Sequence, residues 1–546
     1  MVVISIRAAK AVLAAAAIAV SLVACGGEDD GGDAGGEPAS KILRVNFGSE
    51  PPALDPGLAT DVTSANILNA LMDPLVKLGP DLEPTPSIAE SWDVSEDGIT
   101  VTFHLRTDGK WTNGDPVTAN DFEFSWKRTV SPELGADYAY QFYGIEGVQE
   151  YNGCSKKCDA LRDKVGVKAL DDATLEVKLT SPQPWFIQQM AHTSFLAVHE
   201  ATVEEFGDKW TEPENIVTNG PFRLTGWEHD SSITLKKWEG WRDAASVDID
   251  GVDGQMIADS TTALSAFEAD EFDACIDVQT CVPTDEFERL QGTPELTIHP
   301  GLGVQFIGIN VNNVPDVNQR RALALAVDRT AIVENVTKAG EKPATSFTPE
   351  GMPGFDQITQ DFIPATADLE LAKSYLAKAK DPVNSVTLFA NQDALAKNIQ
   401  VAVQANWKDL GIDTDVKAQE WAQFLEFLGP PPNKAVDTFY VGWIGDYVDA
   451  INFLQLSQCG SGLNFADFCD EEFDRLLDEA VKSQDDEERY GLYGEAEARL
   501  TGPEGAFPYI PLYWIVYPIL HKTEVVDWQP NLLDQFDWTA VKIESS

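Results

Sequence analysis

The clearest pattern in the chain is an alternation of apolar and polar residues from Ile99 to Leu105, which predicts a strand with one buried face. The segment Asn113–Asp115 follows and predicts a turn, because asparagine and glycine tolerate positive φ. Thr118 then lies three residues before Asp121, a spacing typical of a helix start. The stretch 88–128 is therefore predicted to be strand, turn and helix, which by periodicity alone fits any α/β unit.

Helical periodicity recurs later in the chain. Four stretches repeat apolar residues at helical spacing and are predicted to be helices, namely 318–329, 394–410, 473–481 and 489–500. Gly411 ends the second of them, since a glycine relieves left-handed strain at a helix end. The apolar run 508–518 contains three prolines, which excludes a membrane-spanning helix there.

The first residues have the pattern of an export signal. Arg7 and Lys10 precede the apolar run 11–20, which is too short to span a bilayer with margin. Leu22–Cys25 resembles a bacterial lipobox, so we expect residues 1–24 to be a signal peptide and Cys25 to carry lipid, with an ordinary secretory signal as the alternative. Residues 26–40 are rich in Gly, Asp and Glu and predict a flexible tether, which would hold the protein at the membrane through Cys25.

Composition limits the class of protein. A chain of 546 residues is too long for one hydrophobic core, so two or three domains are expected, and 43% hydrophobic residues describe a folded chain. The net charge of −50 becomes −52 after loss of the signal, with 37 basic against 89 acidic residues. Such a surface disfavours nucleic acid as a partner. It is compatible with cationic solutes, with adaptation to salt or acid, or simply with solubility.

The cysteines are consistent with an exported protein. Beside Cys25, six remain, and they form three pairs that are close in sequence: Cys154 and Cys158, Cys275 and Cys281, Cys459 and Cys469. In an oxidising compartment these pairs are expected to be local disulfides. The alternative is a zinc site, which fits poorly because no histidine pair lies near them. No metal and no cofactor are expected.

Several motifs together resemble the family 5 extracellular solute-binding proteins, the receptors of oligopeptide, dipeptide and nickel importers of the ATP-binding cassette class. The first is the pattern AESW…DG.T.TFHLR…KW..GDPVTA.DF.FSWKR within 88–128. The segment 219–224 with Trp238 and Trp241 resembles a strand pair of the family, and 318–329 resembles one of its helices. The segment 508–518 resembles the one by which the chain returns to its first domain.

The resemblance implies an α/β fold of the periplasmic-binding-protein type II class, with two lobes joined by a two-strand hinge and an extra inserted α+β domain. It places lobe I at 41–76, 205–303 and 515–546. The inserted domain is expected at 77–204 and lobe II at 304–514.

The resemblance also implies a ligand site. The segment 440–449 is similar to the family's W-x-x-D-Y/N-x-D-P motif, with Ala450 in place of the proline, and in peptide-binding members its first aspartate accepts the ligand's α-ammonium. That role falls on Asp446, with Trp443 as an apolar wall; the alternative is that Asp446 caps a turn and Trp443 belongs to a core. The resemblance also implies that the extended segment 60–62 lies along the ligand backbone. Independently of the resemblance, the aromatic cluster Tyr138, Tyr140, Phe142 and Tyr143 is a candidate lining of a ligand cleft, and the alternative is a plain core cluster. The expected ligand-binding residues are Asp446, Trp443, Tyr447, Thr60, Val62, Tyr138, Tyr140 and Trp421.

Catalytic signatures are scarce. There is no GxSxG elbow, and His199-Glu200 lacks the second histidine of HExxH. We therefore expect no enzyme, but a monomeric extracytoplasmic receptor that closes its lobes on a peptide and delivers it to the permease of an importer. The alternatives are the same role for an oligosaccharide or metal complex, and a lipid-anchored secreted hydrolase.

Overall fold

The computed structural model describes residues 40–79, 82–276, 281–359, 363–428, 436–544. The predicted signal peptide, Cys25 and most of the predicted tether lie outside these residues. Among the described residues, no helix is both long and apolar enough to cross a membrane.

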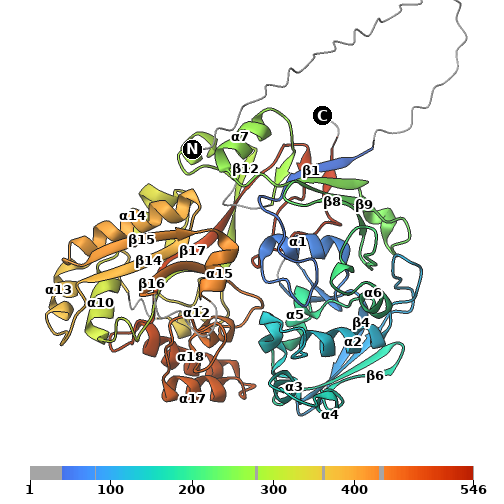
Figure 1. Ribbon diagram of the computed structural model, residues 1–546, viewed down its shortest axis with the longest axis horizontal. Helices are drawn as coiled ribbons and strands as arrows, with labels where there is room; N and C mark the ends of the chain where they lie inside the picture. Colours follow the sequence, from blue (N-terminus) through green and yellow to red (C-terminus); the bar gives the residue numbers. More distant parts are fainter. Residues whose placement is uncertain (1–39, 80–81, 277–280, 360–362, 429–435, 545–546) are drawn as a thin grey trace, which may run out of the picture. The chain divides into compact units, whose positions relative to one another are not determined.

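The first sheet has five strands in the order β11-β1-β10-β9-β8 (Figure 1). Its strands are β1 (Ile42–Asn46), β8 (Phe222–Glu228), β9 (Ser232–Lys237), β10 (Gly251–Gln255) and β11 (Ala274–Cys275). β1 pairs in parallel with both β10 and β11, so the start of the chain is held by segments about two hundred residues further on. Helix α1 (Val62–Leu71) supplies Ile67 and Leu68 to the core below this sheet.

The block 88–128 forms the predicted strand, turn and helix. β5 (Thr100–Leu105) alternates buried and half-buried residues, and Gly114 adopts a φ of 98° in the turn. Thr118 and Asp121 form a capping box at the start of α2 (Ala119–Thr129). β5 belongs to a four-stranded antiparallel sheet with β4 (Ala89–Val94), β7 (Thr174–Lys178) and β6 (Val167–Asp171). A separate hydrophobic core lies there and contains the buried side chains of Phe122, Trp126 and Trp111. Burial of these large apolar surfaces stabilises this region.

The largest sheet has six strands in the order β13-β17-β12-β16-β14-β15. Its strands are β12 (Leu296–Ile309), β13 (Lys342–Pro343), β14 (Ser385–Asn391), β15 (Asp413–Gln419), β16 (Thr438–Ile444) and β17 (Tyr509–Leu520). The predicted helices are present as α10 (Val317–Leu325), α14 (Ala394–Lys408), α17 (Glu471–Ala480) and α18 (Asp486–Thr501). Gly411 follows α14 with a φ of 78°, as expected for a helix end.

Shorter elements complete the described chain. The helices are α3 (Val148–Asn152), α4 (Asp159–Arg162), α5 (Phe186–Gln189), α6 (Glu200–Phe206), α7 (Ser260–Glu268), α9 (Phe287–Leu290), α11 (Arg329–Ile332), α12 (Phe355–Ile358), α13 (Leu369–Leu376), α15 (Trp421–Leu428) and α16 (Ile451–Leu454). Two short strand pairs are β2 (Val76–Leu78) with β3 (Pro84–Pro86), and β18 (Val525–Val526) with β19 (Lys542–Ile543).

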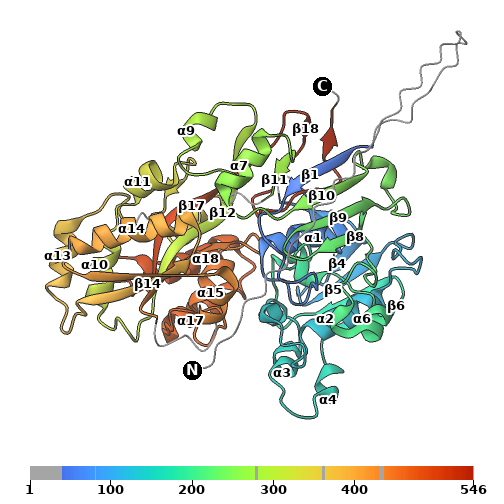
Figure 2. The same cartoon turned by 45° about the horizontal axis from the view of Figure 1, so that its top comes forward.

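The two long strands β12 and β17 run side by side through two different cores (Figure 2). Ile510 and Leu512 of β17 pack in the core of the six-stranded sheet, whereas Tyr517 and Ile519 pack in the core of the first sheet. The proline-containing run 508–518 is thus mostly strand, and its register with β12 shifts between Pro300 and Val304. This pair is therefore a physical link between two separately packed regions.

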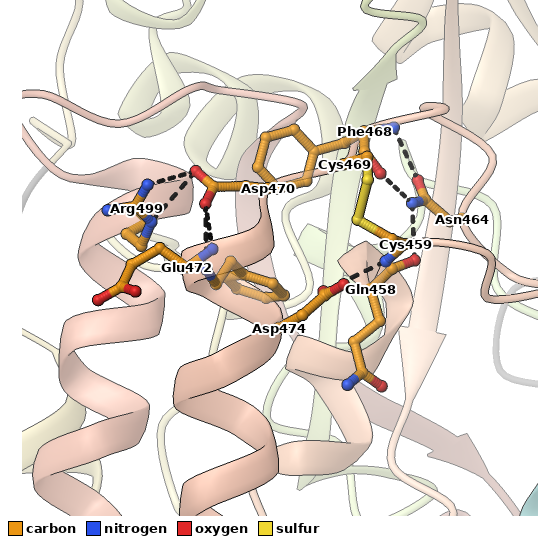
Figure 3. The surroundings of a disulfide bond; sticks show 10 residues. Gln458, Cys459, Asn464, Phe468, Cys469, Asp470, Glu472, Asp474 and Arg499 are labelled. Atoms are coloured by element: carbon orange, nitrogen blue, oxygen red, sulfur yellow. Dashed lines mark hydrogen bonds and ion pairs between the residues drawn. A yellow bond between two sulfur atoms is a disulfide. The ribbon is translucent and has the colours of Figure 1, made fainter.

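The three expected disulfides are formed: Cys154–Cys158, Cys275–Cys281 and Cys459–Cys469. The third closes a loop just before α17 (Figure 3). Asn464 of that loop donates to the carbonyl oxygens of Gln458 and Phe468, and Asp474 of α17 accepts a hydrogen bond from the backbone N–H of Cys459. Nowhere in the described chain are three or more His, Cys, Asp or Glu residues placed to hold a metal ion.

Candidate functional site

Asp446 lies in the loop between β16 and α16, and its side chain is 7% exposed. Asn452 of α16 holds it from two sides. The Nδ2 group of Asn452 donates to Asp446 Oδ2 at 3.0 Å, and its Oδ1 accepts the backbone N–H of Asp446, also at 3.0 Å. The same Oδ1 accepts from Trp443 Nε1 at 3.0 Å. One amide therefore fixes both residues that the sequence had singled out.

Two residues from the region of the four-stranded sheet also reach Asp446. The hydroxyl of Tyr140 donates to Asp446 Oδ2 at 3.4 Å, and His192 Nε2 lies 3.5 Å from Asp446 Oδ1. Tyr138 packs edge-on against both the Tyr140 and the His192 rings. Tyr138, Tyr140 and Asp446 were all expected at the ligand site, and the structure brings them together.

The groups around Asp446 are hydrogen-bond donors. Ser194 N–H donates to His192 Nδ1 at 3.2 Å, so the ring proton of neutral His192 is on Nε2, which faces Asp446. Burial and the charge of Asp446 raise the pKa of the Tyr140 hydroxyl well above its usual range, which keeps that hydroxyl protonated. No Lys or Arg of the described chain forms an ion pair with Asp446.

This arrangement has a clear chemical consequence. A buried carboxylate is costly unless a charge or several hydrogen bonds compensate it. Asp446 has hydrogen bonds but no Lys or Arg partner among the described residues, so a ligand ammonium would supply a positive charge at a shielded position.

Tyr447 contributes an aromatic contact beside the loop. Its ring stacks on Trp185, with centroids 6.0 Å apart and planes at 10°, and both side chains are buried. Such an aromatic pair contributes more stabilisation than the burial of its apolar area alone. Trp185 immediately precedes α5, so this contact joins the same two regions as the Tyr140–Asp446 bond.

Three expected ligand residues make no hydrogen bond or ring contact with Asp446 among the described residues. Thr60 is half-buried and Val62 is exposed, both at the start of α1. Trp421 is exposed at the start of α15, where its ring lies near Phe424. The assignment of all three to the ligand site stays a prediction.

Sequence reasoning missed Asn452, His192 and Trp185. Asn452 is fully buried, yet a lone asparagine has no periodic signal. His192 and Trp185 lie in irregular segments about 250 residues from Asp446, and only the tertiary fold brings them close. The one local signal for Asn452 is that the polar residues Asp446, Asp449 and Asn452 recur at every third position after the apolar strand β16.

Comparison with known proteins defines the class. The model of the bacterial extracellular solute-binding proteins, family 5 (middle), matches residues 83–465, and the chain belongs to this family. Its fold is that of the type II periplasmic binding proteins, with two lobes and an extra domain.

Three relatives are peptide-binding proteins by name. The chain is 36% identical to the dipeptide-binding protein DppE of Bacillus subtilis, over 91% of this chain and 92% of that protein. It is 34% identical to the periplasmic oligopeptide-binding protein OppA of Escherichia coli, over 88% of each. A solved structure of Haemophilus influenzae OppA in complex with RPPGFSPFR matches with a TM-score of 0.83 and 27% identity, over 92% of this chain and 99% of that one.

Proposed function

We propose that this protein is the substrate-binding receptor of an ATP-binding cassette importer and that it captures peptides outside the cytoplasm. The observation that carries the proposal is the buried Asp446 carboxylate, which accepts hydrogen bonds from Asn452 and Tyr140 and pairs with no Lys or Arg of the described chain. A peptide's α-ammonium has the charge and the donors that this carboxylate lacks. The peptide-binding relatives support the same ligand class.

Capture involves closure of two regions on the ligand. Asp446 and Tyr447 come from the six-stranded region, whereas Tyr140, His192 and Trp185 come from the region of the four-stranded sheet. A ligand that contacts both sides stabilises the closed state, because it adds binding free energy only there. The strand pair β12 and β17 would act as the hinge, since it links the two cores.

A two-part experiment tests this proposal. Native mass spectrometry of protein purified from its own host identifies the carried ligand, and calorimetric titration with that ligand measures its affinity. We expect one peptide per chain, a rise in melting temperature on binding and an unchanged peptide after prolonged incubation. A bound sugar or metal complex would replace the peptide assignment, and turnover of the ligand would indicate the hydrolase.

The location proposal rests on Cys25, which lies outside the described residues. We infer that cleavage before Cys25 and lipidation of its thiol anchor the protein to the cell membrane. Cys25→Ser should release the protein to the medium or leave it unprocessed. An unchanged membrane fraction with normal processing would contradict the anchor.

A further inference from the structure

Asp61 has an unusual carboxylate next to the ligand site. Its Oδ1 accepts the backbone N–H of Ser64 at 2.9 Å and so caps helix α1. Its Oδ2 is buried and has no hydrogen-bond partner among the described residues. Burial raises the pKa of this carboxyl, as expected when the charged form is poorly solvated.

Asp61 and Asp446 share a neighbour. Burial, and then the charges of Asp446 and Asp61, raise the pKa of the Tyr138 hydroxyl well above its usual range. Both carboxylates therefore lie within electrostatic range of this side chain. Helix α1, which Asp61 caps, packs against the short helix η2 (Thr193–Phe195). His192 directly precedes η2 and contacts Asp446. Fold and electrostatics thus place the two carboxylates around one aromatic cluster.

Three other buried acids of the described chain have a compensation that Asp61 and Asp446 do not have. Asp55 pairs with Arg128 at 2.6 Å, and Asp449 pairs with Arg489 at 3.4 Å. Glu497 forms no ion pair within the described chain, but both of its oxygens accept hydrogen bonds: from backbone N–H groups and from the hydroxyls of Thr348 and Thr501.

Among the described residues, Asp446 accepts hydrogen bonds from Asn452 and Tyr140, and Asp61 Oδ2 has no donor. In the described chain, neither of these two acids forms an ion pair with Lys or Arg. The two carboxylates near this aromatic cluster therefore have no Lys or Arg of the described chain to balance them.

We propose that Asp61 forms a second cation subsite, so that the preferred ligands are peptides whose first residue has a positively charged side chain. The α-ammonium pairs with Asp446, and the lysine or arginine side chain of the same residue pairs with Asp61 Oδ2. The flexible lysine stem allows one residue to present both charges. The inference rests on the proposed function, because it needs a peptide amino terminus at Asp446.

The test compares two tripeptides that differ by one charge, Lys-Ala-Ala and norleucine-Ala-Ala. Norleucine keeps the four-carbon chain and lacks the ammonium. Calorimetric titration is performed with the wild type, with Asp61→Asn and with Asp259→Asn. Asparagine is as good a helix cap as aspartate, so Asp61→Asn removes the charge while α1 keeps its cap. Asp259 caps α7 in the same way and is the matched control.

We expect the wild type and Asp259→Asn to bind the lysine peptide about tenfold or more tightly than the norleucine peptide. In Asp61→Asn the two peptides should bind with nearly equal affinity, because only the lysine peptide is weakened. Asp61→Ser, which also retains a cap, should reproduce that loss of discrimination.

Equal affinity of the wild type for both peptides would overturn the subsite, and so would discrimination that survives in Asp61→Asn. An equal loss for both peptides in Asp61→Asn would show that Asp61 only supports the fold. If the wild type binds neither peptide nor any other peptide, the proposed function fails instead, so the two failures are distinguishable.

Discussion

Asn452 and Asp446 are joined by two hydrogen bonds of 3.0 Å each, one to the carboxylate and one to the backbone N–H. Asn452 is completely buried and also accepts from the indole of Trp443. A single amide thus sets the direction of the carboxylate and the position of the adjacent aromatic wall. We predict that Asn452 positions the acceptor rather than contacting the ligand.

Asn452→Ala should weaken binding of a peptide with a free amino terminus by about tenfold, since the carboxylate loses a charge-assisted hydrogen bond and its fixed orientation. The N-acetylated form of the peptide should be affected little. Calorimetry with both forms measures this difference.

Asn464→Ala is a matched control for Asn452→Ala. Asn464 is also buried and hydrogen-bonded, but it lies in the loop closed by Cys459 and Cys469 (Figure 3). Both variants should lower the free energy of unfolding, and only Asn452→Ala should change affinity. An equal loss of affinity in Asn464→Ala would mean that general destabilisation is the cause.

Trp185→Ala should speed ligand dissociation by about three- to tenfold, because the closed state loses the stack on Tyr447. Trp185→Phe keeps an aromatic ring and should stay closer to the wild type. Surface plasmon resonance with an immobilised peptide gives the dissociation rates. Identical rates for Trp185→Ala and the wild type would show that the stack does not contribute to closure.

Asp61 should make stability depend on pH in a defined direction. Its pKa is raised above the ordinary 3.8, so the folded state binds the proton more tightly than the unfolded state. The stabilisation that comes from this bound proton is complete below pH 3.8, and it is lost as the pH rises through the raised pKa of the folded state. Relative to Asp61→Asn, the wild type should therefore lose free energy of unfolding above about pH 4.

Urea unfolding of both proteins between about pH 3.5 and 7 measures this difference, and the contributions of other groups cancel in the comparison. A difference that stays constant over that range would show that the Asp61 carboxyl has the same pKa in the folded and the unfolded chain.

The three disulfides close short stretches, so the loss of each should lower the free energy of unfolding by about 2 kcal/mol. The double variant of Cys459→Ser and Cys469→Ser should show this in urea unfolding, and the double variant of Cys154→Ser and Cys158→Ser should behave alike. Denatured, unreduced wild-type protein should have no free thiol. A count of six would refute the pairings.

Secondary structure could be predicted from the sequence for elements that have one buried face. The alternation from Ile99 to Leu105 and the Thr118–Asp121 signal predicted β5 and α2, because burial and capping act over a few residues. The prolines of 508–518 excluded a membrane helix, but they did not reveal β17, which pairs with β12 across two hundred residues. Pairing at that distance leaves no periodic signal.

The site was predictable only in part. Asp446, Trp443, Tyr138 and Tyr140 came from motif resemblance and aromatic clustering, and the structure brings Tyr138, Tyr140 and Asp446 together. Sequence could not indicate His192, because its role depends on the tautomer that Ser194 selects and on a contact across 254 positions.

The central claim is that Asp446 accepts a peptide's α-ammonium, and calorimetric titration of wild type and Asp446→Asn with one peptide in free and N-acetylated form tests it most directly. Asparagine keeps the shape and removes the charge, so the melting temperature without ligand should barely change. Loss of the buried charge partner should cost on the order of 3 kcal/mol, about a hundredfold in Kd for the free peptide. The variant should discriminate little between the two forms. Binding of the free peptide by Asp446→Asn as tightly as by the wild type would contradict the account.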